Sequence, residues 1–204
     1  MTPAEVRAAA AAGAVVLDLR QPRPFATEHV PGAVNFQFNR ADLADRAEMA
    51  LPRDVPFVVH AEPDPIGRVA GEILAQAGFD VRGTLAGGLR AWKAAGLDTT
   101  TLPLLTVEQL RQRRSAFRVL DTREGFEYRY GHIPGAELLE WTEAWDRADG
   151  VPAGAPLALV CGDQVRSAYV ASVLLRAGKP AHLVFGGMVD WLERGYEVEK
   201  SSRT

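Results

Sequence analysis

An internal repeat constrains the fold of this chain more than any other feature of its sequence. The segment VVLDLRQPRPFATEHVPGAVNF (15–36) resembles RVLDTREGFEYRYGHIPGAELL (118–139), and LAGGLRAW (85–92) resembles VFGGMVDW (184–191). Each half therefore carries, in the same order, an Asp-x-Arg, a histidine before Pro-Gly-Ala, a Gly-Gly pair and a tryptophan. Self-similarity over so long a period indicates a duplicated structural unit.

The repeat predicts two domains, 1–98 and 99–204, each the size of one small domain. The joint lies in LDTTTLPLL (97–105), which is rich in threonine and carries a proline. Each half opens with a helix-capping pattern, Thr2-Pro3-Ala4-Glu5 in the first and Thr106-Val107-Glu108-Gln109 in the second.

Short β-rich runs alternate with helical stretches in each half. In the second half the runs are FRVLD, LALVC and AHLVF, and helices are expected over 106–114, 165–177 and 188–194. This alternation predicts an α/β fold in which each domain is a small, mainly parallel sheet flanked by helices. Ligands of such sheets bind at the carboxyl ends of the strands.

Composition and charge exclude several classes of function. The chain has 204 residues, 47% of them hydrophobic, and a net charge of −3, as expected of a soluble globular protein rather than a nucleic-acid binder. Its one basic run, RQRR (111–114), is expected on a solvated helix face. We find no apolar run of membrane-spanning length and no secretion signal, and the single cysteine predicts a reducing cytoplasm.

Cys161, the only cysteine, lies where the apolar run LALV meets a predicted helix. The intervening CGDQVR forms a tight turn whose backbone N–H groups can surround an anion, and the helix N-terminus and Arg166 add positive charge. We expect these surroundings to lower the pKa of the thiol and make it a nucleophile. The alternative is an inert core cysteine, which the polar Gly-Asp-Gln flank disfavours.

This combination of motifs resembles the rhodanese superfamily, and specifically its tandem-domain sulfurtransferases. The resemblance spans nearly the whole chain: Asp-x-Arg and EHVPGA or GHIPGA in each half, Cys-x-x-x-x-Arg-Ser in the second half, and Gly-Gly before a tryptophan in both. It implies two tandem rhodanese-like domains and a thiosulfate sulfurtransferase-like enzyme. Cys161 would accept sulfur from thiosulfate or 3-mercaptopyruvate as a persulfide and pass it to cyanide, a thiol or another protein.

The resemblance also implies a set of site residues. Cys161 and Arg166 would be catalytic. The substrate and persulfide would be bound by Gly162, Asp163, Gln164, Val165, Ser167 and Arg123. Arg123 has an alternative role in a structural ion pair with Asp121 or Glu127. No metal or organic cofactor is expected, and the partners are a small anionic sulfur donor and a thiophilic acceptor, with no nucleic acid and no membrane.

Two features leave the activity open. The six-residue loop from Cys161 to Arg166 resembles sulfurtransferases, whereas related phosphatases use one residue more, so a cysteine-dependent phosphatase or arsenate reductase is the less favoured alternative. Asp163 weakens attraction for an anion, which favours a second alternative, a carrier that exchanges persulfide with a partner protein. A non-catalytic binding domain is disfavoured by Cys161 and Arg166.

The first half acts as an internal control. Its segment FVVHAEPDPIGRVAGEILAQAG (57–78) places Ala61 opposite Cys161 and Ile66 opposite Arg166, with two acids and two prolines between them. Since proline has no N–H to donate, the anion-binding turn is lost along with the thiol, and the first domain is expected to be inactive and structural. His29 and His132 recur in both halves, which predicts a structural role, and Trp141 and Trp145 are expected to pack.

Overall fold

The predicted repeat is present as two α/β units in the computed structural model, which describes residues 1–152 and 154–200. The chain divides into Met1–Thr101 and Leu102–Thr204, a division that falls within the predicted joint 97–105 and three residues after the predicted domain boundary at Asp98. Both units are parallel sheets with helices on two faces, as the alternation of strand and helix signals predicted.

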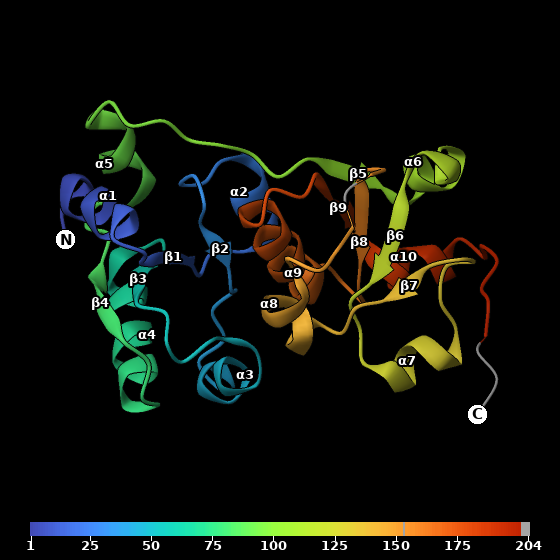
Figure 1. The fold of residues 1–204 in the computed structure, drawn as a ribbon, viewed down its shortest axis with the longest axis horizontal. Coiled ribbons are helices and arrows are strands. Elements are labelled where there is room, and N and C mark those ends of the chain that lie inside the picture. The colour runs from blue at the N-terminus through green and yellow to red at the C-terminus, as the bar shows by residue number, and fades with distance from the viewer. Residues whose placement is uncertain (153, 201–204) are drawn as a thin grey trace. The chain divides into compact units, whose positions relative to one another are not determined.

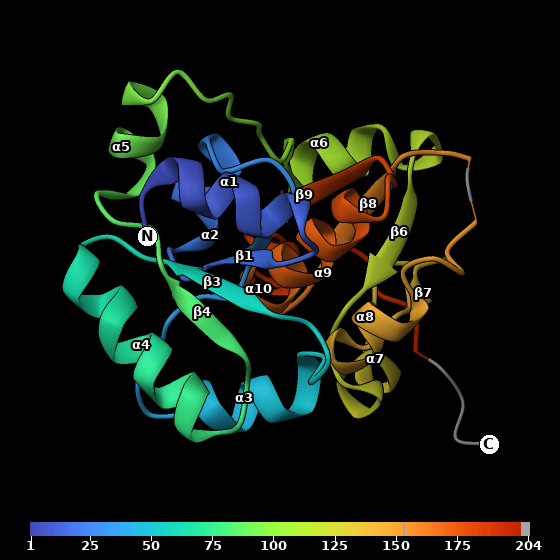
Figure 2. The same cartoon turned by 60° about the vertical axis from the view of Figure 1, so that its left-hand side comes forward.

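The N-terminal unit contains a four-stranded sheet in the order β2-β1-β3-β4 with every neighbouring pair parallel. Its strands are β1 (Val15–Asp18), β2 (Val34–Asn35), β3 (Phe57–His60) and β4 (Val81–Thr84). Its helices are α1 (Pro3–Ala11), α2 (Pro22–Thr27), α3 (Leu43–Ala50), α4 (Asp64–Gln76) and α5 (Gly88–Ala94). Figure 1 shows α1 above this sheet and α3 and α4 below it, and Figure 2 agrees.

The C-terminal unit contains a five-stranded parallel sheet in the order β5-β9-β8-β6-β7. Its strands are β5 (Leu104–Thr106), β6 (Arg118–Asp121), β7 (Glu137–Leu138), β8 (Leu157–Val160) and β9 (Ala181–Phe185). Its helices are α6 (Val107–Gln112), α7 (Gly125–Tyr130), α8 (Ala144–Arg147), α9 (Val165–Arg176) and α10 (Gly187–Glu193), with 3₁₀ turns η1 (Arg114–Ala116) and η2 (Trp141–Glu143). In Figure 1, α8 and α9 lie on one side of this sheet and α6 and α10 on the other.

The two capping patterns start helices as predicted. Thr2 Oγ1 accepts the N–H of Glu5, and Thr106 Oγ1 accepts that of Gln109. In each case the side chain of the residue three positions after the threonine accepts the backbone N–H of that threonine. The second of these helices is shorter than predicted, because the backbone leaves the helical region at Arg113 (φ −116°) and continues as the separate turn η1.

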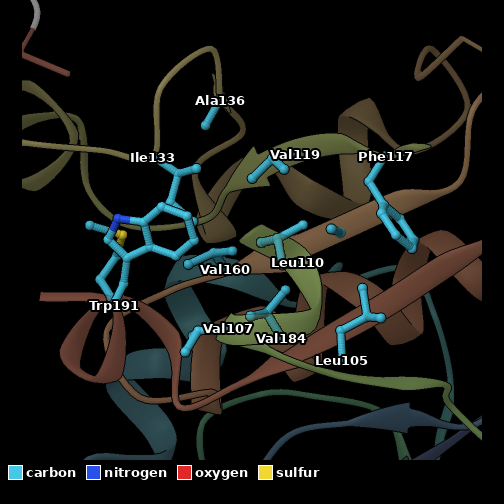
Figure 3. Close-up of a cluster of buried hydrophobic side chains, with 12 residues drawn as sticks. Leu105, Val107, Leu110, Phe117, Val119, Ile133, Ala136, Val160, Val184 and Trp191 are labelled. Atoms are coloured by element: carbon cyan, nitrogen blue, oxygen red, sulfur yellow. The ribbon is translucent and has the colours of Figure 1, made fainter. Parts of the chain in front are cut away.

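The core of the C-terminal unit fixes the strand that ends at the cysteine. All four residues of β8 are buried, as expected of a central parallel strand covered on both faces. Figure 3 shows the cluster on the α6 and α10 side, where Val160 lies among Val107, Leu110 and Trp191. This packing holds the carboxyl end of β8, and therefore Cys161, in place.

The recurring histidines pack in the same way in both units. His29 stacks on Phe25 with ring centroids 3.9 Å apart, and its Nδ1 lies 2.8 Å from the Phe25 carbonyl. His132 stacks on Tyr128 at 3.7 Å, with Nδ1 2.9 Å from the Tyr128 carbonyl. This shared geometry supports the structural role predicted from the repeat.

Candidate active site

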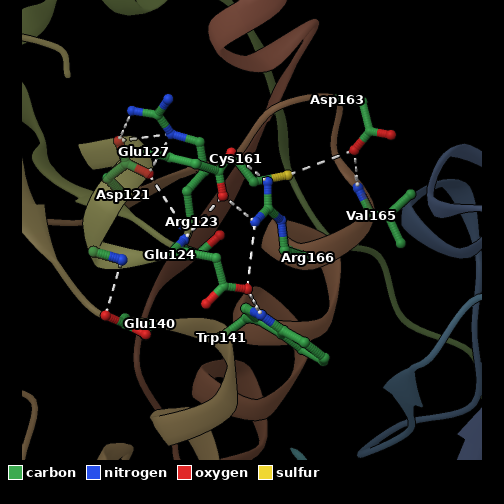
Figure 4. A network of polar contacts seen from close by, with 12 residues as sticks. Asp121, Arg123, Glu124, Glu127, Glu140, Trp141, Cys161, Asp163, Val165 and Arg166 are labelled. Carbon is green, nitrogen blue, oxygen red and sulfur yellow. Dashed lines mark hydrogen bonds and ion pairs between the residues drawn. The ribbon is translucent and has the colours of Figure 1, made fainter. Parts of the chain in front are cut away.

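Cys161 is the first residue after β8, and its side chain is fully buried beneath the loop that leads into α9. Its Sγ accepts the backbone N–H of Gln164 at 3.2 Å and the hydroxyl of Ser167 at 3.3 Å. The thiol itself points to Asp163, with Sγ 3.8 Å from Oδ1 (Figure 4). Of the loop N–H groups expected around the sulfur, that of Gln164 contacts Sγ, whereas the Val165 N–H donates to Asp163 Oδ1 at 3.0 Å.

The carbonyl groups of the loop are held by the N-terminus of α10. The Met188 N–H donates to the Cys161 carbonyl at 2.7 Å, and the Val189 N–H donates to the Gly162 carbonyl at 3.1 Å. Gly187 makes this approach possible, because a Cβ there would lie 2.5 Å from the Cys161 oxygen and 2.6 Å from the Gly162 oxygen. Sequence reasoning missed these contacts, although the Gly-Gly pair before Trp191 was their signal.

Gln164 adopts a backbone conformation that residues with a side chain rarely populate. Its φ is +134°, and among the described residues no other non-glycine has a positive φ. Strain of this kind is of order 1–3 kcal/mol and persists where surrounding contacts determine the backbone. Here the strained residue supplies the N–H that reaches the sulfur, so the strain is associated with the orientation of a donor.

The expectation of a lowered thiol pKa was wrong for this structure. Burial raises the pKa of Cys161 above its ordinary value, and the nearby Asp163 carboxylate raises it further, although hydrogen bonds from Ser167 and Gln164 act in the opposite direction. Burial prevails because the side chain has no exposed surface. Burial and Asp163 therefore favour the thiol form of Cys161, whose Sγ lies 3.8 Å from Asp163 Oδ1.

Arg166 is held by two acidic side chains of the segment that starts α7. Its guanidinium contacts Glu127 through two bonds, one of them at 2.9 Å, and lies 3.7 Å from Glu124. Burial alone would raise the pKa of Glu127, but the hydrogen bonds from Arg166 and the Glu124 N–H lower it below the ordinary value. Trp141 continues the network by donating its indole N–H to Glu124 at 2.7 Å, consistent with its predicted packing role.

Arg123 is engaged with Asp121, the structural partner considered in the sequence analysis. Its Nε and Nη2 contact the carboxylate, the latter at 2.6 Å, and Nη2 also donates to the Gly131 carbonyl at 2.8 Å. Arg20 and Asp18 form the same pair at 2.6 Å in the N-terminal unit, where Arg20 reaches the Glu28 carbonyl. Since the pair recurs where no cysteine is present, the geometry favours a structural role for Arg123 over the predicted contact with substrate.

The corresponding loop of the N-terminal unit lacks both the sulfur and its donor. Ala61 occupies the position of Cys161, and Gly67 occupies that of Ser167. The two positions are neighbours here as well, because a Cβ at Gly67 would lie 3.7 Å from the Ala61 Cβ. Acidic side chains occupy the surroundings: the Asp64 carboxylate accepts the Gly87 N–H at 2.9 Å, and Glu62 Oε1 would lie 3.0 Å from a Cβ at Gly88.

A profile of the rhodanese-like domain matches residues 2–95 and again residues 106–194. The chain belongs to the rhodanese-like domain family. Each match covers one unit of this rhodanese-like chain, so the repeat in its sequence is a repeat of the family domain.

Solved structures include similar chains. A rhodanese-related protein from Thermoplasma volcanium is 27% identical over 48% of this chain and 99% of its own, with a TM-score of 0.47. A rhodanese-like domain protein from Staphylococcus aureus is 28% identical over 50% of this chain and 100% of its own, with a TM-score of 0.45. A thiosulfate sulfurtransferase from Pseudomonas aeruginosa is 26% identical over 99% of this chain, with a TM-score of 0.42.

This rhodanese-like chain matches only 43% of the Pseudomonas protein's length. A comparison with curated proteins gives no match. Across residues 1–152 and 154–200, no three His, Cys, Asp or Glu side chains are grouped so that they could hold a metal ion. In the same ranges, no helix combines the length and the apolar character needed to cross a membrane.

Proposed function

We propose that this protein is a sulfurtransferase that carries sulfane sulfur as a persulfide on Cys161. The observation that carries the proposal is the position of Sγ, which receives the Gln164 N–H at 3.2 Å and the Ser167 hydroxyl at 3.3 Å. Donors fixed in this way stabilise negative charge on Sγ, the charge that the Cys161 thiolate carries when it attacks the donor and again when it is released at the end of the cycle.

The reaction with thiosulfate proceeds in two steps. The Cys161 sulfur attacks the outer sulfur of thiosulfate, the S–S bond of the donor breaks, and the enzyme persulfide and sulfite are formed. The thiol proton leaves through Asp163, which faces it, to solvent or to sulfite. In the second step cyanide or a thiolate takes the terminal sulfur, and the Cys161 thiolate is released. Reaction with 3-mercaptopyruvate differs in that pyruvate leaves.

The residues of the loop after β8 make different contacts. Gln164 and Ser167 contact the sulfur, whereas Gly162 has its carbonyl bound to α10 and Val165 has its N–H bound to Asp163. Arg166 supplies the positive charge nearest the loop, balanced by Glu127. In the N-terminal unit the sulfur and its hydroxyl donor are both missing, so we assign the reaction to the C-terminal unit alone.

One observation favours a second candidate, a carrier loaded by the persulfide of another protein. Asp163 is exposed and its carboxylate lies 3.8 Å from Sγ, where it repels a dianion such as thiosulfate. A persulfide presented by a partner protein carries less charge at the reacting sulfur. The two candidates share the Cys161 intermediate and differ in the donor.

Intact-mass measurement tests the proposal. The protein is incubated separately with thiosulfate, with 3-mercaptopyruvate and with a cysteine-desulfurase persulfide, and Cys161→Ser is the matched control. A gain of about one sulfur atom, lost on adding cyanide and absent from the control, supports the relay, and the donor that loads fastest identifies the candidate. No gain with any donor refutes the relay and leaves phosphatase or arsenate reductase activity to be assayed.

A further inference from the structure

Away from Cys161, each unit contains a pocket, and the two pockets are built from equivalent positions of the repeat. In the C-terminal unit a cavity of about 250 Å³ is lined by Arg111, Arg114, Ile133, Trp191, Tyr196 and Glu197, among others. In the N-terminal unit a cavity of about 390 Å³ is lined by Arg7, Ala10, Val30, Trp92, Leu97 and Asp98, among others. The duplication therefore supplies a comparison of one pocket in two versions.

The versions differ in chemistry at two positions. Arg114 replaces Ala10, and Tyr196 replaces Leu97, whereas the tryptophan, the first arginine and the acidic residue recur. The C-terminal pocket thus has two cations and one carboxylate in its wall, while the N-terminal pocket has one of each. Only the C-terminal version combines an excess of positive charge with two aromatic rings.

Arg114 is a partly buried cation without a counter-ion. Its Nη1 donates to the Phe117 carbonyl at 3.1 Å and its Nη2 to the Pro134 carbonyl at 2.8 Å, both neutral acceptors. In the described part of the chain Arg114 takes part in no ion pair. Its buried Nε also has no hydrogen-bond partner. Desolvation lowers the pKa of this guanidinium, as burial of an uncompensated charge must.

The aromatic wall is rigid. Trp191 is buried, its indole N–H is bound to the Glu197 carbonyl at 2.9 Å, and Tyr196 packs edge-on to it with centroids 5.1 Å apart. Figure 3 shows Ile133 beside the Trp191 ring. The Arg111 guanidinium lies 4.7 Å from the centroid of the Tyr196 ring. A flat apolar ligand can pack here at little entropic cost, because its partners are already fixed.

We propose that the C-terminal pocket binds a small aromatic carboxylate, whose anionic group pairs with Arg114 and whose ring packs against Trp191 and Tyr196. The volume suits a ligand with a single ring. The N-terminal pocket does not bind such an anion, because Ala10 offers no donor and Asp98 balances Arg7. The pocket is a site separate from Cys161 and does not depend on the function proposed for it.

The two equivalent tryptophans provide the test. The Trp191 indole N–H is bound to the Glu197 carbonyl, and the Trp92 indole N–H is bound to the Asp98 carbonyl at 2.8 Å. In a ¹⁵N-labelled full-length chain their indole signals are assigned by Trp→Phe substitution and followed during titration with benzoate. We expect saturable shifts of the Trp191 signal with a dissociation constant of about 1 mM or tighter, and no saturable shift of Trp92.

Benzamide, which has the same ring without the charge, serves as the matched probe, and we expect it to bind at least tenfold more weakly. Arg114→Ala should weaken benzoate binding at least tenfold. Arg113→Ala removes the same charge from the preceding residue, whose guanidinium lies over the Phe117 ring and does not line the pocket, and should change binding less than threefold. Equal binding of benzamide, equal shifts of both tryptophans, equal effects of the two variants, or no shift of Trp191 overturns the proposal. The benzamide comparison uses the unaltered chain and holds even if Arg114→Ala does not fold.

Discussion

Replacement of Gly187 by alanine tests how the loop around Cys161 is held. Gly187 has a φ of +58°, and an added Cβ would lie 2.5 Å from the Cys161 carbonyl oxygen. Ordinary van der Waals contacts of a Cβ begin at 3.4 Å, so the loop backbone must retreat by about 0.9 Å. Misplacement of reacting groups by about 1 Å can reduce a rate about 100-fold, and we expect sulfur loading of Cys161 to fall by tenfold or more.

Gly178→Ala is the matched control. Gly178 has a φ of +74° and lies in the same unit, but a Cβ there would meet nothing within 4 Å. Both variants lose about 1–2 kcal/mol of unfolding free energy from the left-handed backbone. We expect Gly187→Ala to lose about 1–3 kcal/mol more by urea denaturation, because its Cβ also clashes with backbone atoms and overpacking of this kind costs that much.

The loading rate is measured by intact mass with the donor that reacts fastest. Gly178→Ala should load at the rate of the unaltered chain. If the two variants lose equal stability and load at equal rates, the close approach of α10 to the loop does not determine its geometry, and the reasoning is refuted.

Three further predictions concern the ionisable groups of the site. Asp163→Asn should lower the pKa of Cys161, because it removes a carboxylate that raises this pKa. The rate of alkylation by iodoacetamide should then reach its plateau at lower pH, whereas the control Glu193→Gln should leave the pH profile unchanged. Ser167→Ala should raise that pKa further and reduce unfolding free energy by about 1 kcal/mol, and an unchanged alkylation profile would contradict the contact with Sγ. The pKa of Glu127 is lowered in the folded protein, so its ionised carboxylate stabilises the fold at pH values above 4.5, and this stabilisation is lost as the pH falls through the folded pKa. Glu127→Gln should therefore reduce the loss of unfolding free energy, measured by urea denaturation, between pH 6 and about 3.

Periodicity and capping signals were sufficient to predict the fold. The alternation of strand and helix runs, the repeat at Asp-x-Arg and Pro-Gly-Ala, and the capping boxes at Thr2 and Thr106 rest on local sequence, and each has its counterpart in the structure. The loop after Cys161 was also predictable, because a polar turn between a buried strand and a helix is a local feature.

Interactions between distant segments were not predictable. Arg166 was expected to add positive charge to the loop, but its partner Glu127, 39 residues away, was not foreseen, because only packing of α7 against the loop places them together. Arg114 was expected on a solvated face, but the turn at Arg113 directs it to the Pro134 carbonyl and into a pocket.

The sequence by itself determined that this chain is a duplicated α/β protein with one nucleophile candidate, and that only its second half retains it. The protonation of that nucleophile was decided by tertiary structure. A loop of N–H groups and an arginine indicate a thiolate when considered alone, but desolvation of a fully buried sulfur and the charge of Asp163 outweigh them. Burial is a property of the whole packed unit, so no local pattern could have predicted it.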